Sequence, residues 1–261
     1  MHPEPVLPDV DDLSTVPTGD MPGDSVQISQ EHVRKARTIM PELWRLIEPM
    51  VGSRRVVVSV HGGSGVGKSE IGSLLAHYLR LNGMGAYVMS GDNYPRRIPS
   101  ANDAERLRQF RTAGVQAVVA AGEYTESVRA ELAELREGHQ DANPDKVSLH
   151  PWLATYQRAG REALRRYLGT EAEIDFAEVN DIIKDFRDGA DHLNLKRMGR
   201  QADELWYDDV DFSGVQVLLV EWTHGNNERL ERIDVPILLS STPEETLAHR
   251  RARARDGATD S

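Results

Sequence analysis

The fold is decided by one stretch, Val56-Val57-Val58-Ser59-Val60-His61-Gly62-Gly63-Ser64-Gly65-Val66-Gly67-Lys68-Ser69. Its apolar first half is typical of a buried strand, and a glycine-rich turn follows. A helical pattern then extends from Lys68 to about Asn82, where Gly83 and Gly85 end it. The next run, Ala86-Tyr87-Val88-Met89, indicates a second strand. Together these segments predict a βαβ unit with two parallel strands joined by a right-handed crossover.

The glycine-rich turn predicts a phosphate site, because residues 62–69 fit the pattern G-x-x-x-x-G-K-[S/T] between a strand and a helix. Glycines let the backbone fold tightly, so that successive N–H groups converge on an anion at the helix N-terminus. Lys68 brings a positive charge to the outer phosphates, and Ser69 offers a hydroxyl to Mg²⁺. We therefore expect the phosphates of ATP to bind Gly62, Gly63, Ser64, Gly65, Val66, Gly67, Lys68 and Ser69.

Two acids follow predicted strands. Asp92, in Ser90-Gly91-Asp92-Asn93-Tyr94, lies at the carboxyl end of the second strand, where parallel sheets hold their ligands. A carboxylate there can accept the proton of a hydroxyl that attacks the γ-phosphate, although a solvated turn has the same composition. Glu221 closes the apolar strand 217–220, where nucleotide sites place a Mg²⁺-ordering carboxylate; an acid that only caps the strand is the alternative.

The last predicted helix, about 243–261, is rich in arginine. Arg251 and Arg255 share one face at helical spacing, and guanidinium groups there can neutralise charge on a phosphoryl group in transfer. A solvated basic helix end, favoured by the helix dipole, is the alternative.

Taken together, 56–69, Asp92, the strand ending at Glu221 and the stretch 249–256 resemble the uridine kinase/phosphoribulokinase group of P-loop kinases. The segment 175–189 is similar to the helix that precedes the substrate-side strands of that family. The resemblance covers about 54–98 and 173–256. It implies an α/β P-loop NTPase fold with a parallel sheet flanked by helices, ATP and Mg²⁺ as cofactors, Asp92 as the base, and the arginine helix as part of a lid.

The chain departs from this family in three places. A helical insertion, about 100–172, follows the second strand. Glu221 is followed by Trp222-Thr223-His224-Gly225 rather than directly by glycine. The sequence stops at Ser261, inside the expected lid, so we expect either a lid that is cut short or a fragment of a longer polypeptide. These departures bear on the acceptor more than on the type of reaction.

The sequence as a whole predicts one kinase domain over 28–261, and a proline-rich, flexible N-terminal arm over 1–27 precedes it. Ser29 is a candidate N-cap for a helix over about 30–50, which Pro41 would kink or split. Further helices are expected at 125–137 and 152–168, and further strands at 215–220 and 235–239.

Composition narrows the class of protein. The 261 residues carry a formal charge of −11, which argues against a nucleic-acid partner, and no apolar run is long enough to span a bilayer. Cysteine is absent, and the first residues show no secretory pattern, so we expect a cytoplasmic protein without disulfides or thiolate zinc sites. The expected partner is a small-molecule acceptor. A homo-oligomer stays open.

Three functions remain open at this point. The first is an ATP-dependent kinase that transfers the γ-phosphate to a hydroxyl of a nucleoside or sugar-like metabolite. The second is an adenylylsulfate kinase, because Gly91-Asp92-Asn93 also resembles an element of that family. The third, a regulatory ATPase or switch, would need a positioned water rather than a base for an organic hydroxyl. We further expect a solvated turn at Asp208-Asp209 and Asp211, and surface or acceptor-binding roles for His192, Lys196, Arg197 and Arg200.

Overall fold

A four-stranded parallel sheet forms the core of the computed structural model, which describes residues 4–10, 12–24, 26–199, 201 and 203–242. Its strands are β1 (Val56–Gly62), β2 (Ala86–Ser90), β5 (Val217–Trp222) and β6 (Val235–Leu239), in the order β2-β5-β1-β6. The predicted parallel pair is therefore present, with β5 inserted between β1 and β2. Every residue of β5 is buried, as expected for a strand covered on both faces.

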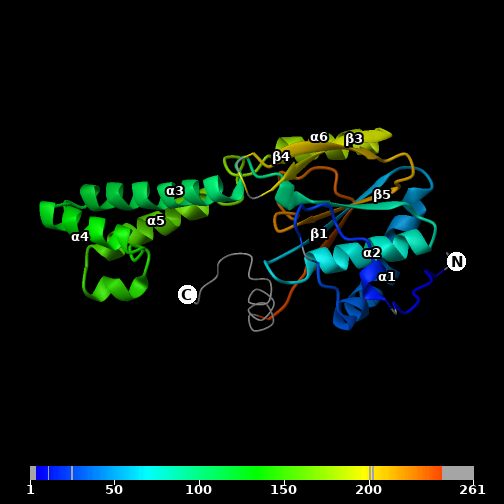
Figure 1. The fold of residues 1–261 in the computed structure, drawn as a ribbon, viewed down its shortest axis with the longest axis horizontal. Coiled ribbons are helices and arrows are strands. Elements are labelled where there is room, and N and C mark those ends of the chain that lie inside the picture. The colour runs from blue at the N-terminus through cyan, green and yellow to red at the C-terminus, as the bar shows by residue number, and fades with distance from the viewer. Residues whose placement is uncertain (1–3, 11, 25, 200, 202, 243–261) are drawn as a thin grey trace. The chain divides into compact units, whose positions relative to one another are not determined.

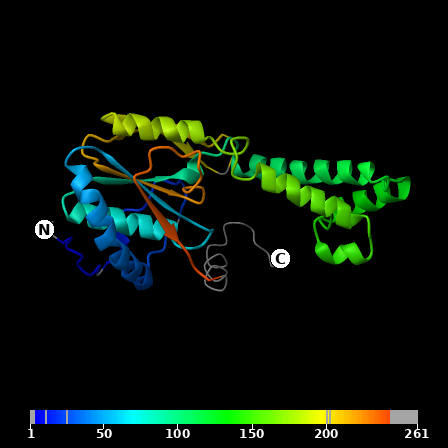
Figure 2. The same ribbon diagram turned by 180° about the vertical axis from the view of Figure 1, so that it is seen from behind.

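Helices and a hairpin cover the two faces of this sheet (Figures 1 and 2). One face carries α1 (Gln30–Val51) and α2 (Lys68–Leu81); the other carries α6 (Phe176–Arg187) and the antiparallel pair β3 (His192–Met198) and β4 (Leu205–Asp211). The expected solvated turn at Asp208, Asp209 and Asp211 is thus a strand. None of the described helices combines the length and the apolar run that crossing a membrane requires.

Helix α1 is continuous through both of its prolines, Pro41 and Pro49, so the split considered at Pro41 does not occur. The predicted cap is present, since the Ser29 hydroxyl accepts from the His32 amide. An apolar stripe along α1 lies in the main core, where it compensates for the hydrogen bonds that proline cannot donate.

The N-terminal segment differs from the mobile arm expected from its prolines. It contains a short helix, η1 (Leu13–Thr15), and buries Val10 and Val16 in the main core. At the end of α2, the side-chain oxygen of Asn82 accepts from the backbone N–H of Val6, and its side-chain N–H donates to the carbonyl of Val6. The prolines of this segment do not prevent Val10 and Val16 from packing in the core.

A second compact unit spans Pro95–Ile174 and contains the expected helical insertion. It consists of α3 (Pro99–Ala120), α4 (Glu126–Glu137), η3 (Pro144–Ser148) and α5 (Leu153–Tyr167). The unit has its own core, in which the rings of Trp152 and Tyr156 lie 6.3 Å apart.

Helices α3 and α5 approach closely because each presents a glycine to an aromatic ring of the other. A methyl group at Gly160 would come within 2.5 Å of the Phe110 ring. Gly160→Ala should therefore destabilise this unit by about 1–2 kcal/mol, the overpacking cost less the gain in helix propensity. Hydrogen exchange should rise in α3 and α5 but not in the parallel sheet.

Gly138→Ala is the matched control, because it lies in the same unit and a methyl group there contacts nothing closer than 3.5 Å. Equal exchange in the two variants would show that close helix packing does not limit the stability of the unit.

Candidate active site

The glycine-rich turn joins the end of β1 to the start of α2, and its glycines are required by geometry. A Cβ atom at Gly62 would lie 2.3 Å from the carbonyl oxygen of Leu239 in β6. Gly65 and Gly67 have φ angles of 79° and 90°, which L side chains rarely adopt. The ammonium group of Lys68 is nearly buried and donates to the carbonyl of Gly63 at 3.0 Å, so it folds back over the turn.

The strand register places the second predicted site residue, Glu221, beside this turn. Glu221 pairs with Val60 of β1 on one side and with Ser90 of β2 on the other. Val60 precedes the turn by two positions, and Ser90 precedes Asp92 by two. The order β2-β5-β1 therefore brings the turn, Glu221 and the segment of Asp92 to one edge of the sheet.

Glu221 is fully enclosed by this arrangement. Its carboxylate accepts from the Ser90 hydroxyl at 3.3 Å and also from the Ser69 hydroxyl. Burial is the main reason that the pKa of Glu221 rises to about 7, and the negative charge of Asp92 raises it further against the opposing effect of Lys68. A buried acid with so high a pKa is a place where an added cation would be stabilising.

Asp92 is exposed on a short helix, η2 (Gly91–Asn93), which follows β2. The preceding Gly91 lies against the indole of Trp222, so closely that a Cβ atom would come within 2.1 Å of the ring. Trp222 is itself packed against Phe176 of α6, with ring centroids 5.4 Å apart. Trp222, which stands where the resembling kinase family has glycine after the acid, thus supports the turn that carries Asp92.

These residues fit a nucleotide with Mg²⁺. The turn is closely packed at Gly62, where there is no room for a Cβ atom, and Lys68 folds over it. The Ser69 hydroxyl and the Glu221 carboxylate meet at the end of the turn. Among the described residues, no group of three or more His, Cys, Asp or Glu side chains could hold a metal ion alone. Mg²⁺ commonly uses one or two protein ligands with water and phosphate oxygens, which is what Ser69 and Glu221 could offer.

The structure describes only some of the other predicted site residues. Arg251, Arg255 and Arg200 are outside the described residues. Lys196 and Arg197 point inward rather than to a free surface, because Lys196 pairs with Glu178 and Arg197 with two acids. Sequence reasoning gave no role to Ser90 or Asp20, whose partners are far away along the chain.

Comparison with known proteins finds a likeness in sequence to one protein and a likeness in fold to a solved structure. No protein family defined by its sequence pattern matches the chain. The bifunctional alpha-galactosidase/sucrose kinase AgaSK of Mediterraneibacter gnavus is 36% identical over 202 residues, which are 77% of this chain and 17% of that protein. A crystal structure provisionally named a fructose transport system kinase, from Silicibacter sp. TM1040, superposes with a TM-score of 0.52 at 14% identity, covering 86% of this chain and 84% of that chain.

The structural likeness confirms the predicted fold class, an α/β fold with a parallel sheet flanked by helices, in line with a P-loop-type fold. The matched part of the Mediterraneibacter gnavus protein is a small fraction of its length, so the two activities in its name describe that protein as a whole.

The raised pKa of Glu221 makes stability depend on pH. The pKa is about 7 in the folded protein, and a glutamate in an unfolded chain titrates near 4.3. Between these values the folded state holds a proton that the unfolded state has released, so this contribution to stability is complete below about pH 4 and is lost as pH rises through about 7. Glu221→Gln abolishes the titration. The unfolding free energy of the wild type minus that of the variant should then fall by on the order of 2–3 kcal/mol from pH 5 to pH 8.

Urea denaturation at several pH values measures this difference. Glu31→Gln is the control, because Glu31 is exposed and its partner Lys35 lowers its pKa, so its contribution is constant from pH 5 to 8. A difference for Glu221 that is independent of pH would mean that the carboxylate is ionised throughout this range.

Proposed function

We propose that this chain is an ATP-dependent kinase that transfers the γ-phosphate of ATP to a hydroxyl group of a sugar. The observation that carries the proposal is the convergence of the glycine-rich turn, Glu221 and Asp92 at the carboxyl edge of one parallel sheet. Phosphate transfer to a hydroxyl requires two things of an active site: it must bind the phosphates, and it must accept the proton of the attacking hydroxyl.

The phosphate side of the reaction falls to residues 62–69. Amide groups of the turn and the N-terminus of α2 would bind phosphate oxygens, and Lys68 would move from Gly63 to the outer phosphates. Ser69 and Glu221 would hold Mg²⁺, which supplies charge neutralisation on the phosphates when bound. Loss of the proton from Glu221 would accompany the arrival of this cation, since its pKa is near neutrality without one.

The acceptor side falls to Asp92. A sugar hydroxyl is a weak acid and becomes a competent nucleophile only as its proton leaves, so a carboxylate beside the phosphates can accept that proton during attack. The exposed position of Asp92 on η2 leaves its carboxylate accessible to a small acceptor. Arg251 and Arg255 would complete the site as part of a lid over the transferred group.

The names of the two similar proteins favour a sugar among the acceptors. One is a sucrose kinase in part, and the other is provisionally a fructose transport system kinase. Neither name includes an adenylylsulfate or a nucleoside. A panel of mono- and disaccharides, nucleosides and adenylylsulfate, tested for acceptor-dependent ADP release, decides between these classes. ADP release that no acceptor stimulates would favour the regulatory ATPase instead.

Asp92→Asn tests the base. The side chain keeps its size but cannot accept a proton, so phosphate transfer to the sugar should fall by about 10²–10⁴-fold. Equilibrium binding of ATP should change by less than about twofold. Parallel loss of ATP binding and of transfer would contradict the assignment of Asp92 to the acceptor.

Lys68→Ala tests the phosphate site. Removing this cation from a water-poor site should cost about 3–4 kcal/mol of transition-state stabilisation, a loss in kcat/KM of some 10²–10³-fold. Lys35→Ala is the control, because Lys35 forms only an exposed pair with Glu31 on α1. Equal turnover in the two variants would remove the turn from the mechanism.

A further inference from the structure

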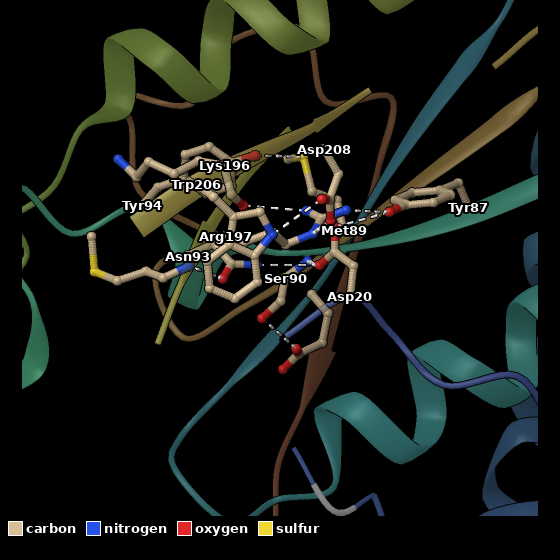
Figure 3. A network of polar contacts seen from close by, with 12 residues as sticks. Asp20, Tyr87, Met89, Ser90, Asn93, Tyr94, Lys196, Arg197, Trp206 and Asp208 are labelled. Carbon is tan, nitrogen blue, oxygen red and sulfur yellow. Dashed lines mark hydrogen bonds and ion pairs between the residues drawn. The ribbon is translucent and has the colours of Figure 1, made fainter. Parts of the chain in front are cut away.

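The N-terminal segment delivers one charged side chain into the interior beside the candidate site. The side chain of Asp20 is only 7% exposed. One carboxylate oxygen accepts from the backbone amide of Ser90 at 2.7 Å. The other accepts from the hydroxyl of Tyr87 at 3.1 Å and from the guanidinium of Arg197 at 2.9 Å (Figure 3).

These contacts fix the end of β2 just before Asp92. The amide of Ser90 binds Asp20, while its hydroxyl donates to Glu221. On the far side of Asp92, the side-chain amide of Asn93 donates to Asp20 at 3.4 Å. The two residues that enclose Gly91 and Asp92 in the chain are therefore both bound to one carboxylate.

The same carboxylate ties the hairpin β3–β4 to this turn. Arg197 of β3 binds Asp20 and also Asp208 of β4, whose other oxygen accepts from the indole N–H of Trp206 (Figure 3). A second bond runs from the amide of Met198 to the side-chain oxygen of Asn93 at 3.1 Å. Asp20 thus lies where three separate segments meet.

Stability alone is a poor reason for this arrangement. Burial raises the pKa of Asp20 against the opposing charge of Arg197, which shows that removal of the carboxylate from water is costly. Buried pairs of this kind often contribute less to stability than an apolar replacement, while they do specify one geometry. A geometry fixed to this degree, directly beside an exposed carboxylate, is what proton transfer to a defined base requires.

We propose that Asp20 is a positioning residue for the acceptor half of the active site. It holds the turn that carries Asp92 and fixes the β3–β4 hairpin to that turn, so the N-terminal segment is part of the site. The inference rests on the proposed kinase function and extends it to a segment far from the phosphate-binding turn in sequence.

Asp20→Asn tests the inference in the full chain. Asparagine keeps an oxygen for the Ser90 amide but presents an uncharged N–H group to Arg197, so we expect the hairpin to shift relative to the turn while the bond from Met198 to Asn93 remains. We expect kcat/KM for the sugar to fall by about 10²-fold, as a displacement near 1 Å at a reacting group does. ATP affinity and ADP release without sugar should stay within about twofold of wild type. A purely structural role would instead lower all three in proportion to the folded fraction.

Two further variants keep the experiment decisive. Asp9→Asn is the matched control, because Asp9 is also an acid of the N-terminal segment that pairs with an arginine, Arg37, but this pair is exposed. In this variant kcat/KM for the sugar, ATP affinity and ADP release without sugar should equal those of the wild type. Tyr87→Phe removes one donor to Asp20 and keeps the ring packed on Phe212, so it should fold if Asp20→Asn does not. It should lower kcat/KM for the sugar by about 3–10-fold with ATP affinity unchanged.

The outcomes separate the two proposals. Wild-type protein that transfers phosphate to a sugar, with unchanged transfer in Asp20→Asn and Tyr87→Phe, overturns the positioning role and leaves the kinase function standing. Wild-type protein that binds ATP but phosphorylates no sugar overturns the function and this inference together. Selective loss of sugar phosphorylation in either variant, with ATP affinity retained, supports both.

Discussion

One buried carboxylate holds the two halves of the candidate site together. Glu221 lies between β1 and β2 and has to be removed from water, which by itself disfavours its charge. The hydroxyl groups of Ser69 and Ser90 and the charge of Lys68 compensate in part. Ser69 and Lys68 belong to the glycine-rich turn, and Ser90 ends β2. Because the compensation is incomplete, its pKa is near neutrality. The protein thereby keeps a site that an added cation would complete.

The fold and the position of the glycine-rich turn could be predicted because their signals are local. The turn 62–69 needs glycine, lysine and serine within eight consecutive positions, and the strands around it are unbroken apolar runs. The position of Glu221 followed from the same rule, since the carboxyl ends of parallel strands meet at one edge. Strand β4, by contrast, escaped prediction: its charged Asp208 and Asp209 have the composition of a turn, and partners on β3 and α6 decide its structure.

The acceptor half could not be predicted because its contacts join distant parts of the chain. Asp20 and Arg197 are 177 positions apart. Asp20 also lies in a segment whose prolines and aspartates are typical of a disordered arm, and two buried valines are too few to form a periodic pattern. An arginine in a predicted strand is normally expected to be solvated, and only the fold shows that Arg197 is buried in an ion pair.

Under the proposed function, this difference between the two halves bears on how the acceptor of such an enzyme can change. The phosphate side is encoded in one short stretch whose geometry tolerates few substitutions, as the contact between Gly62 and Leu239 shows. The acceptor side is assembled from the N-terminal segment, the end of β2 and the β3–β4 hairpin, joined through side chains. Side-chain contacts can be replaced one at a time without disturbing the turn 62–69. The similar structure named for fructose shares this fold at 14% sequence identity, so the arrangement of helices and strands persists while most side chains differ.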